Sequence, residues 1–321
     1  MHIVITGANG FVGSNLVKAL LTGQHQLANF NRLTLLDLDF REQHEDSRVK
    51  YLKGDFSNTT LIKKALEQPV DVVFHLASIP GGMAEQHYEL SRKVNIDATL
   101  FLFEQLRQQS IQHNSMARVV FASTIAVYGT DLPELITDET PLKPHLTYAG
   151  QKQFGEIIIE DFSRKGWFDG VAVRLPGIVA RPQQASGLLS AFMSDVFWNL
   201  SQNKKFQCPV SSKAVAWWMS VKCCVENLIH AASLDIEQLQ SGSRVFALPV
   251  LRLTMQDVVN GLAQQFEFNP EALVSYDSNN HDLEKNFGAY PGIHTDRADA
   301  LGFQHDGDIQ QLIRNTLNLK L

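Results

Sequence analysis

Cysteine is scarce in this sequence, and it contains neither long apolar runs nor an excess of positive charge. The 321 residues include three cysteines, an odd number that does not support the disulfide framework of a small secreted protein. No apolar run reaches the roughly 18 residues that a membrane span needs. Lys and Arg number 28 against 34 Asp and Glu, so the net charge of −6 provides no global attraction to nucleic acid or to an anionic membrane.

The cysteines and the first residues of the chain indicate the cytoplasm. Cys223 and Cys224 are adjacent in an apolar stretch, which favours buried reduced thiols over a redox pair. The residues after Met1 run directly into a glycine motif and lack the basic segment and cleavage site of a secretory signal. The 11 histidines are scattered without the spacing of metal ligands, so we predict no metal site. We expect a cytoplasmic protein whose partner is a small molecule rather than nucleic acid or a membrane.

The composition is otherwise that of an ordinary globular protein, with 44% hydrophobic and 19% charged residues. In the first half, short β-branched runs alternate with helical patterns, which is typical of βαβ units and a parallel sheet. We therefore predict an α/β fold built on a doubly wound parallel sheet of the Rossmann type. The expected strands are 3–5, 33–37, 49–52, 70–76, 118–123 and 170–175, and the expected helices are 61–67, 91–109 and 151–165.

A glycine-rich turn follows the first expected strand and precedes a helix. Gly7, Gly10 and Gly13 have the Gly-x-x-Gly-x-x-Gly spacing, one form of the dinucleotide fingerprint. Such glycines allow a tight turn and close approach of the backbone to a pyrophosphate, which the helix N-terminus attracts. A purely structural turn would also use glycines, so the acidic residue downstream matters. The residues expected to contact the dinucleotide here are Gly7, Asn9, Gly10, Phe11, Val12 and Gly13.

The acidic residue that completes a dinucleotide site is Asp37, at the end of the second expected strand. A carboxylate there accepts hydrogen bonds from the adenosine ribose and repels a 2′-phosphate, which favours NAD over NADP. Asp37 lies further from Gly7 than the usual twenty or so residues. We attribute the difference to an insertion of unknown purpose at residues 21–32.

Two other acidic residues lie near this expected site. Asp39 is two residues beyond Asp37, and we expect it to cap the turn. Asp55 follows the third expected strand, beside Phe56, and could reach the adenine amino group. A role for Asp55 as a turn residue is supported nearly as well, and both interpretations stay open.

Tyr148 and Lys152 are spaced i and i+4, which places them on one face of a helix. A nearby ammonium favours the phenolate and so lowers the pKa of a tyrosine from its usual value of about 10. This pair is common on helices, but here Ser123 and Thr124 end the fifth expected strand, where an open parallel sheet forms its ligand crevice. We expect Thr124 to orient a substrate hydroxyl while Tyr148 removes its proton.

Taken in order along the chain, these motifs resemble the extended short-chain dehydrogenase/reductase superfamily, which includes the NAD-dependent epimerases and dehydratases. The resemblance implies NAD as the cofactor and Thr124, Tyr148 and Lys152 as the catalytic group, with Lys152 also holding the nicotinamide ribose. It implies a homodimer through the helices at 91–109 and 151–165, and a structural role for Asn95. The further cofactor residues considered are Asp37, Asp55, Phe56, Leu76, Ala77, Ser78, Pro176 and Ile178.

Departures from the superfamily pattern narrow the reaction. The sugar-nucleotide dehydratases carry Thr-Asp-Glu where this chain has Thr124-Ile125-Ala126, so the acid and base for eliminating water are missing. The 4-epimerases bind a nucleotide diphosphate with an arginine that is absent from Ala216-Trp217-Trp218-Met219. The chain most resembles the D-erythronate dehydrogenase group, through the segments 75–85, 123–129 and 148–152. The segment after Arg181-Pro182 is shorter and less basic than in that group, which leaves the particular acid open.

The resemblance implies oxidation of the 2-hydroxyl of a small sugar acid, similar to D-erythronate, to a 2-oxo group with NAD as hydride acceptor. An anionic substrate needs a cation, for which Arg181 is the better placed candidate, whereas Arg174 lies within a strand and is expected to form a structural ion pair. Gly81 and Gly82 could direct N–H groups at substrate oxygens or form a flexible turn. The expected substrate residues are Gly81, Gly82, Ser123, Thr124 and Arg181.

The strand–helix alternation ends at about residue 176. We predict that residues 1–175 form an NAD-binding domain, that segments near 221–248 pack back on it, and that 176–321 form mainly a smaller substrate-binding lobe. The alternative function is an NAD-dependent sugar-nucleotide epimerase or reductase. A non-catalytic NAD-binding regulator is less well supported, because the Thr–Tyr–Lys set is intact.

Overall fold

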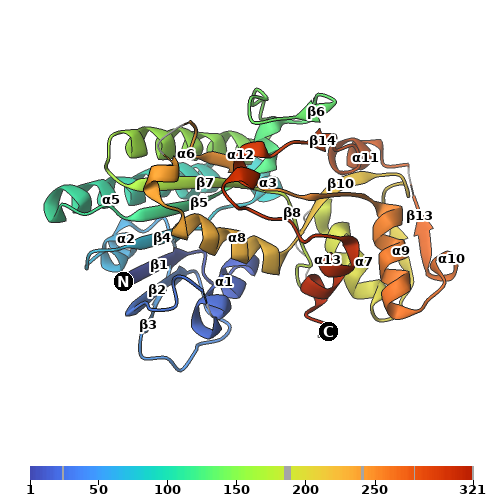
Figure 1. Cartoon of the computed structure of the whole chain (residues 1–321), viewed down its shortest axis with the longest axis horizontal. Coiled ribbons are helices and arrows are strands. Elements are labelled where there is room, and N and C mark those ends of the chain that lie inside the picture. Colours follow the sequence, from blue (N-terminus) through green and yellow to red (C-terminus); the bar gives the residue numbers. More distant parts are fainter. Residues whose placement is uncertain (24, 184–188, 240–241, 278, 320–321) are drawn as a thin grey trace. The chain divides into compact units, whose positions relative to one another are not determined.

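The computed structural model describes residues 1–23, 25–183, 189–239, 242–277 and 279–319 (Figure 1). The chain forms two compact units. Unit 1 consists of Met1–Val127, Pro144–Arg174 and Val225–Ala247. Unit 2 consists of Tyr128–Lys143, Leu175–Cys224 and Leu248–Leu321.

Unit 1 is built on a seven-stranded sheet with the strand order β11-β7-β5-β4-β1-β2-β3. Within this sheet every strand pair with a described register is parallel, and the order reverses between β1 and β4, which confirms the predicted doubly wound sheet. The strands are β1 (His2–Thr6), β2 (Arg32–Asp37), β3 (Val49–Lys53), β4 (Val72–His75), β5 (Arg118–Thr124), β7 (Asp169–Leu175) and β11 (Val245–Ala247).

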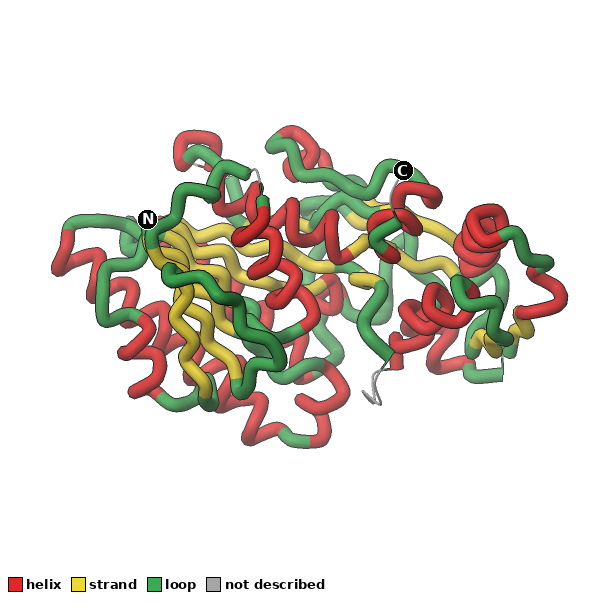
Figure 2. Tube along the Cα trace, turned by 90° about the horizontal axis from the view of Figure 1, so that it is seen from below, coloured by secondary structure: helices red, strands yellow, loops and turns green. Residues whose placement is uncertain are grey.

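Helices lie on both faces of this sheet (Figure 2). All five residues of β1 are buried, as expected for a strand covered on both sides. Phe103 of α5 and Phe162 of α6 belong to one core cluster with Phe121 of β5, so these two helices pack on the same face. The helices are α1 (Phe11–Thr22), α2 (Thr59–Ala65), α3 (Gly81–Gln86), α4 (Tyr88–Arg92), η1 (Lys93–Ala98), α5 (Thr99–His113), η2 (Ile125–Tyr128), α6 (Thr147–Arg164), α8 (Val221–Ser233) and η4 (Ile236–Leu239).

Three expected segments differ from the structure. The helix expected over 91–109 is interrupted by the single-turn π-helix η1, a feature that arises when one residue is accommodated without ending the helix. The helix expected over 151–165 begins at Thr147, so it contains Tyr148. The stretch 21–32, which we attributed to an insertion, begins inside α1, because α1 continues to Thr22, and it contributes the buried residues Leu27 and Phe30.

Unit 2 has a three-stranded sheet, β12-β10-β8, and two two-stranded sheets, β13-β9 and β14-β6. Its core joins α7, α9 and α13 to these sheets through residues such as Phe197, Trp218 and Leu262. The strands are β6 (Leu135–Ile136), β8 (Gly177–Val179), β9 (Phe206–Cys208), β10 (Val215–Ser220), β12 (Leu251–Thr254), β13 (Val274–Tyr276) and β14 (Gly292–Ile293). The helices are η3 (Leu189–Ala191), α7 (Phe192–Leu200), α9 (Met255–Phe266), α10 (Pro270–Leu273), α11 (His281–Phe287), α12 (Asp296–Ala300) and α13 (Ile309–Leu317).

Residues 128–143 group with unit 2, although the sequence analysis placed them in the first domain. The reason is the pairing of β6 with β14, in which Leu135 aligns with Gly292 and Ile136 with Ile293. This pairing joins segments more than 150 residues apart, and local periodicity carries no information about it. None of the helices in the described part of the chain has the length and apolar character to cross a membrane.

Candidate cofactor and catalytic site

The turn between β1 and α1 has the close packing that its glycines predict. Gly7 has φ of 71°, in the left-handed region that favours glycine, and a Cβ placed on it would lie 2.7 Å from the Ala77 nitrogen. A Cβ on Gly13 would lie 2.0 Å from the carbonyl oxygen of Gly7. The first glycine therefore lets the turn pass the end of β4, and the third lets α1 pack against the turn.

The carboxylate of Asp37 is held beside this turn. The backbone N–H of Asn9 donates to Oδ2 at 2.8 Å, and the N–H of Leu38 donates to Oδ1 at 2.7 Å. A carboxylate has about four acceptor positions, so both oxygens can still accept from a ribose diol. The glycine turn and this acceptor set fit the adenosine end of NAD, and the same negative charge would repel a 2′-phosphate.

The other two acidic residues have local partners. Asp39 pairs with Lys53 at 2.6 Å in an exposed position, and the Lys53 ammonium lowers the pKa of Asp39. Asp55 accepts a 2.8 Å hydrogen bond from the N–H of Ser57, which is the turn role that the sequence left open for it. Phe56 beside it is buried in the core of unit 1.

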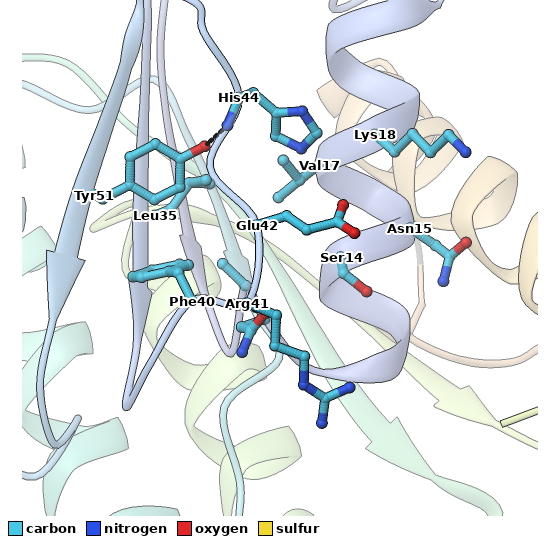
Figure 3. A pocket seen from close by; sticks show the side chains of 12 residues that line it. Ser14, Asn15, Val17, Lys18, Leu35, Phe40, Arg41, Glu42, His44 and Tyr51 are labelled. Atoms are coloured by element: carbon cyan, nitrogen blue, oxygen red, sulfur yellow. Dashed lines mark hydrogen bonds between the residues drawn. The ribbon is translucent and has the colours of Figure 1, made fainter. Parts of the chain in front are cut away.

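A cavity of about 250 Å³ adjoins the glycine turn, and sequence reasoning missed it. Figure 3 shows it between α1 and the segment that joins β2 to β3, with Lys18 on one wall and Tyr51 on the other. The Tyr51 hydroxyl accepts a 2.6 Å hydrogen bond from the N–H of His44, which fixes this segment (Figure 3). The sequence shows no helical pattern between the second and third strands. This lack could have indicated the cavity, because no helix fills the space beside α1.

The end of β4 lies against the same turn. The N–H of Leu76 donates to the carbonyl oxygen of Thr6 at 3.1 Å, and the N–H of Ala77 to its Oγ1 at 3.2 Å. His75 is completely buried between the hydroxyls of Thr6 and Thr99, at 2.7 and 2.8 Å. Burial lowers the pKa of His75 well below its usual value, so this imidazole is neutral at physiological pH. The segment that begins at Leu76 and Ala77 thus borders the glycine turn.

Helix α6 carries Tyr148 and Lys152, and Lys152 reaches strand β5. Lys152 is 3% exposed, and its ammonium donates to the carbonyl oxygen of Ala122 at 2.7 Å. The same nitrogen lies 4.7 Å from the ring centre of Phe121 and 5.7 Å from that of Tyr148. Burial lowers the pKa of Lys152 from 10.5 to about 7, and Glu156 opposes this shift.

Thr124 is the last residue of β5, and it is partly exposed. Its Oγ1 accepts a 3.2 Å hydrogen bond from the N–H of Ala126. A hydroxyl that accepts one hydrogen bond can still donate its proton or accept another. This position is therefore suited to hold a substrate hydroxyl.

Ser123 points away from this position into the interior. It is 2% exposed, and its hydroxyl donates to Oε1 of Glu156 at 2.5 Å. Arg174 of β7 holds the same carboxylate with Nε at 2.9 Å from Oε1 and a terminal nitrogen at 2.8 Å from Oε2. The structural ion pair expected for Arg174 is thus present. The substrate contact expected of Ser123 is not favoured by this orientation, which follows from the alternation of side chains along a strand.

Glu156 was missed by sequence reasoning. Glu156 lies four residues after Lys152, just as Lys152 lies four residues after Tyr148, so the sequence places all three on one helix face. Such spacing is common among helical carboxylates and does not by itself show which partner the side chain meets.

Gly81 and Gly82 are the first two residues of α3 rather than a flexible turn. Glu85 of the same helix accepts hydrogen bonds from the backbone N–H and the hydroxyl of Thr147, at the start of α6. Asn95 of η1 donates to Gln151 of α6 at 2.6 Å and accepts from the N–H of Ile79 at 2.7 Å, a structural role as expected. These contacts join the segment before Gly81 to the helix that carries Tyr148.

The remaining predicted residues belong to unit 2. Pro176 and Ile178 are buried, and Ile178 pairs with Met219 in the β8–β10 sheet. Arg181 is exposed; its N–H donates to Ser194 at 3.0 Å, and its carbonyl oxygen accepts from Trp198 at 2.6 Å. Residues 184–188, which follow Arg181 in the chain, lie outside the described residues.

Comparisons with known proteins agree with this geometry. The model of the NAD dependent epimerase/dehydratase family matches residues 3–234. D-erythronate dehydrogenase from Cupriavidus necator is 33% identical over 98% of this chain and 97% of its own length. The enzyme of that name from Haemophilus influenzae is 32% identical, over 98% of each. The crystal structure of a nucleoside-diphosphate-sugar epimerase from Agrobacterium tumefaciens superposes with a TM-score of 0.91 at 30% identity, covering 100% of this chain and 94% of that one.

The family match covers most of the chain, including the glycine turn, Thr124, Tyr148 and Lys152. The similarity to the two dehydrogenases extends over nearly the whole length of all three proteins. NAD is accordingly the cofactor, and the protein is an NAD-dependent oxidoreductase. The chain belongs to the NAD-dependent epimerase/dehydratase family, as a dehydrogenase of the extended short-chain type.

Proposed function

We propose that this enzyme oxidises the 2-hydroxyl of D-erythronate, or of a closely related small sugar acid, to the 2-oxo group. The observation that carries the proposal is the placement of the Lys152 ammonium beside the Tyr148 ring, at the strand end that bears Thr124. The D-erythronate dehydrogenases similar to this chain support the choice of acid.

The chain's residues divide the work of proton removal. Thr124 orients the substrate hydroxyl, and Tyr148, as phenolate, accepts its proton. The Lys152 ammonium favours the phenolate over the neutral phenol, because an opposite charge nearby stabilises the charged form. The cofactor, when bound, supplies the acceptor for the hydride that leaves the same carbon. Asp37 and the glycine turn would hold its adenosine and pyrophosphate, and Lys152 its nicotinamide ribose.

The substrate carboxylate needs a positive or N–H-rich partner. The candidates, as in the sequence analysis, are Arg181 and the backbone N–H groups of Gly81 and Gly82. A guanidinium suits a carboxylate because its donors match both oxygens. Ser123 is left out of this proposal, since its hydroxyl is directed at Glu156.

The test is a panel of four- to six-carbon sugar acids with NAD, followed by the absorbance of NADH. D-erythronate or a near relative should be oxidised, and Tyr148→Phe should lower kcat by about a hundredfold to ten-thousandfold. The affinity of Tyr148→Phe for NAD should stay the same. Tyr276→Phe is the matched control, because among the described residues that hydroxyl has no hydrogen-bond partner. Absence of NADH with every acid, or full activity in Tyr148→Phe, would refute the proposal.

A sugar-nucleotide epimerase or reductase is the alternative that the 30% identical Agrobacterium structure favours. Calorimetry with UDP distinguishes the two. Tight binding of UDP would support the alternative, whereas the sugar-acid dehydrogenase should not bind it measurably.

We also propose a cytoplasmic homodimer with a role in carbohydrate metabolism. The dimer would use the helices expected at 91–109 and 151–165, as the superfamily resemblance implies. These correspond to η1 with α5 and to α6, on which Ile111 and Ile157 are 63% and 58% exposed. Light scattering should give twice the chain mass, and Ile157→Glu should return the mass to that of one chain. A monomer in the unmodified protein would contradict the proposal.

A further inference from the structure

Glu156 is a buried carboxylate with a rigid set of partners. It is 3% exposed, on the inner face of α6. Arg174 holds its two oxygens in a fork at 2.9 and 2.8 Å, and Ser123 donates to Oε1 at 2.5 Å. A fork of two parallel hydrogen bonds determines direction as well as distance. The carboxylate therefore has a fixed position between β5, β7 and α6.

This position is one helical turn beyond Lys152, just as Lys152 is one turn beyond Tyr148. Residues four apart on a helix lie on the same face. The Lys152 ammonium donates to the carbonyl oxygen of Ala122 and lies over the ring of Phe121, and both of these partners are neutral. Burial of an ammonium among neutral groups disfavours its charged form. A nearby negative charge is therefore needed to keep Lys152 protonated.

The charged and titratable groups around Lys152 come from several elements. Strand β4 contributes His75, which burial keeps neutral, and β7 contributes Arg174, whose charge is directed at Glu156. Helix α6 itself contributes Tyr148 and Glu156. Helix α3 contributes Glu85, which is engaged with Thr147, and η1 meets α6 through the neutral pair Asn95–Gln151. Glu156 is thus the buried carboxylate whose charge acts on Lys152.

We propose that Glu156, held by Arg174 and Ser123, is a positioning residue that keeps Lys152 charged and aligned with Tyr148. It touches neither substrate nor cofactor and acts through Lys152, so the inference rests on the catalytic group proposed above. The fork to Arg174 has a second consequence. It engages both carboxylate oxygens with Arg174, while the Lys152 ammonium donates to the carbonyl oxygen of Ala122, so Glu156 acts on Lys152 through its charge.

The pH dependence follows from this arrangement. Burial lowers the pKa of Lys152 to about 7, and Glu156 raises it. Without the carboxylate, Lys152 loses its proton at a lower pH, and Tyr148 loses the ammonium that favours its phenolate. Activity in neutral solution then requires Glu156 even though the carboxylate takes no part in the chemistry.

The first test is Glu156→Gln, which keeps the shape of the side chain and removes its charge. The alkaline limb of the pH profile of kcat/KM should move to lower pH by about one unit or more, as expected for loss of a nearby opposite charge. A second readout, which does not depend on turnover, is an NMR titration of the protein with its lysines labelled with ¹³C at Cε. The Lys152 signal is identified as the one that is lost in Lys152→Met. That titration should move in the same direction. Glu156→Asp, which keeps the charge, should recover part of the shift.

The matched control is Glu160→Gln, one turn further along α6. Glu160 is a carboxylate that accepts from the hydroxyl of Ser243 and from the N–H of Arg244. Its loss should lower the Tm without moving either titration. If Glu156→Gln lowers only the Tm, as this control does, the proposal is wrong.

If Glu156→Gln does not fold, Ser123→Ala provides the test. Loss of the Ser123 hydroxyl removes one hydrogen-bond donor from the Glu156 carboxylate, so more of its negative charge acts on Lys152. The Lys152 titration should then move to higher pH. No movement, or movement to lower pH, would refute the proposal. The NMR titration also separates this proposal from the proposed function. A protein inactive toward every sugar acid would refute the function, while the Lys152 signal would still report whether Glu156 controls its charge.

Discussion

The backbone N–H of Asn9 donates a 2.8 Å hydrogen bond to the carboxylate of Asp37, which joins the glycine turn to the end of β2. The turn and the acidic residue of the dinucleotide fingerprint are therefore joined by a hydrogen bond within the protein itself. Because both carboxylate oxygens are already oriented, ribose binding does not require Asp37 to give up rotational freedom. Such preorganisation increases affinity by lowering the entropy that binding costs.

Asp37→Ala should raise KM for NAD by about 10- to 100-fold, since a hydrogen bond to a charged group contributes about 1.5–3 kcal/mol. The ratio of activity with NADP to activity with NAD should increase, because the repulsion of a 2′-phosphate is removed. Steady-state kinetics with both cofactors measure this. Asp39→Ala is the control, because Asp39 is exposed and pairs with Lys53; equal effects of the two variants would contradict the assignment of Asp37.

Gly13→Ala should abolish NAD binding or prevent folding, because the new Cβ would meet the carbonyl oxygen of Gly7 at 2.0 Å. Gly150→Ala is a matched change within α6, where nothing lies within 4 Å of the new Cβ. It should stabilise the protein by about 0.5–1 kcal/mol, because glycine in a helix loses more backbone entropy on folding than alanine. Urea unfolding and NAD calorimetry measure both effects. If Gly13→Ala binds NAD normally, the glycine turn must have room for a Cβ at residue 13, which would contradict the close packing described here.

Lys152 should make the stability of the cofactor-free protein increase with pH. Its pKa is about 7 in the folded protein against 10.5 for an ordinary lysine, so between these values the unfolded chain binds more protons. The free energy of unfolding contributed by this residue then rises from pH 7 upwards, while below pH 7 the full cost of the buried charge is present. Lys152→Met should stabilise the protein, and this gain in the free energy of unfolding over the unmodified protein should be larger at pH 7 than at pH 9. If the urea midpoints of the two proteins change by the same amount between pH 7 and pH 9, the expectation is wrong.

Asp169 should be a large contributor to stability in unit 1. It is buried and pairs with both Arg118 and Arg244, which are themselves mostly buried. Asp169→Asn leaves two buried guanidinium groups without their counter-charge, which should cost about 3–5 kcal/mol. Asp161→Asn, at the exposed pair with Arg164, should cost less than about 1 kcal/mol. Thermal unfolding of the two variants measures this, and similar Tm losses would show that burial does not govern these pairs.

The predicted fold was confirmed because its signals are local. A buried strand, a glycine turn and a helix follow one another between His2 and Thr22, and their hydrophobic patterns depend only on near neighbours in the chain. The interruption at η1 and the β6–β14 pair were not predictable in this way. Within η1, Asn95 contacts Ile79 and Gln151, which lie 16 and 56 residues away in the chain, and the β6–β14 pair joins strands still further apart.

The sequence by itself determined the doubly wound sheet, the glycine turn with Asp37, and the spacing that puts Tyr148 and Lys152 on one helix face. These follow from backbone geometry and side-chain periodicity, which act over a few residues. Only the tertiary structure decided that Ser123 faces inward, that Arg174 and Glu156 form a fork one turn from Lys152, and that Lys152 is buried enough to lower its pKa. Charge and proton affinity in an interior depend on every group packed around a site, and packing brings those groups together from four separate strands and helices.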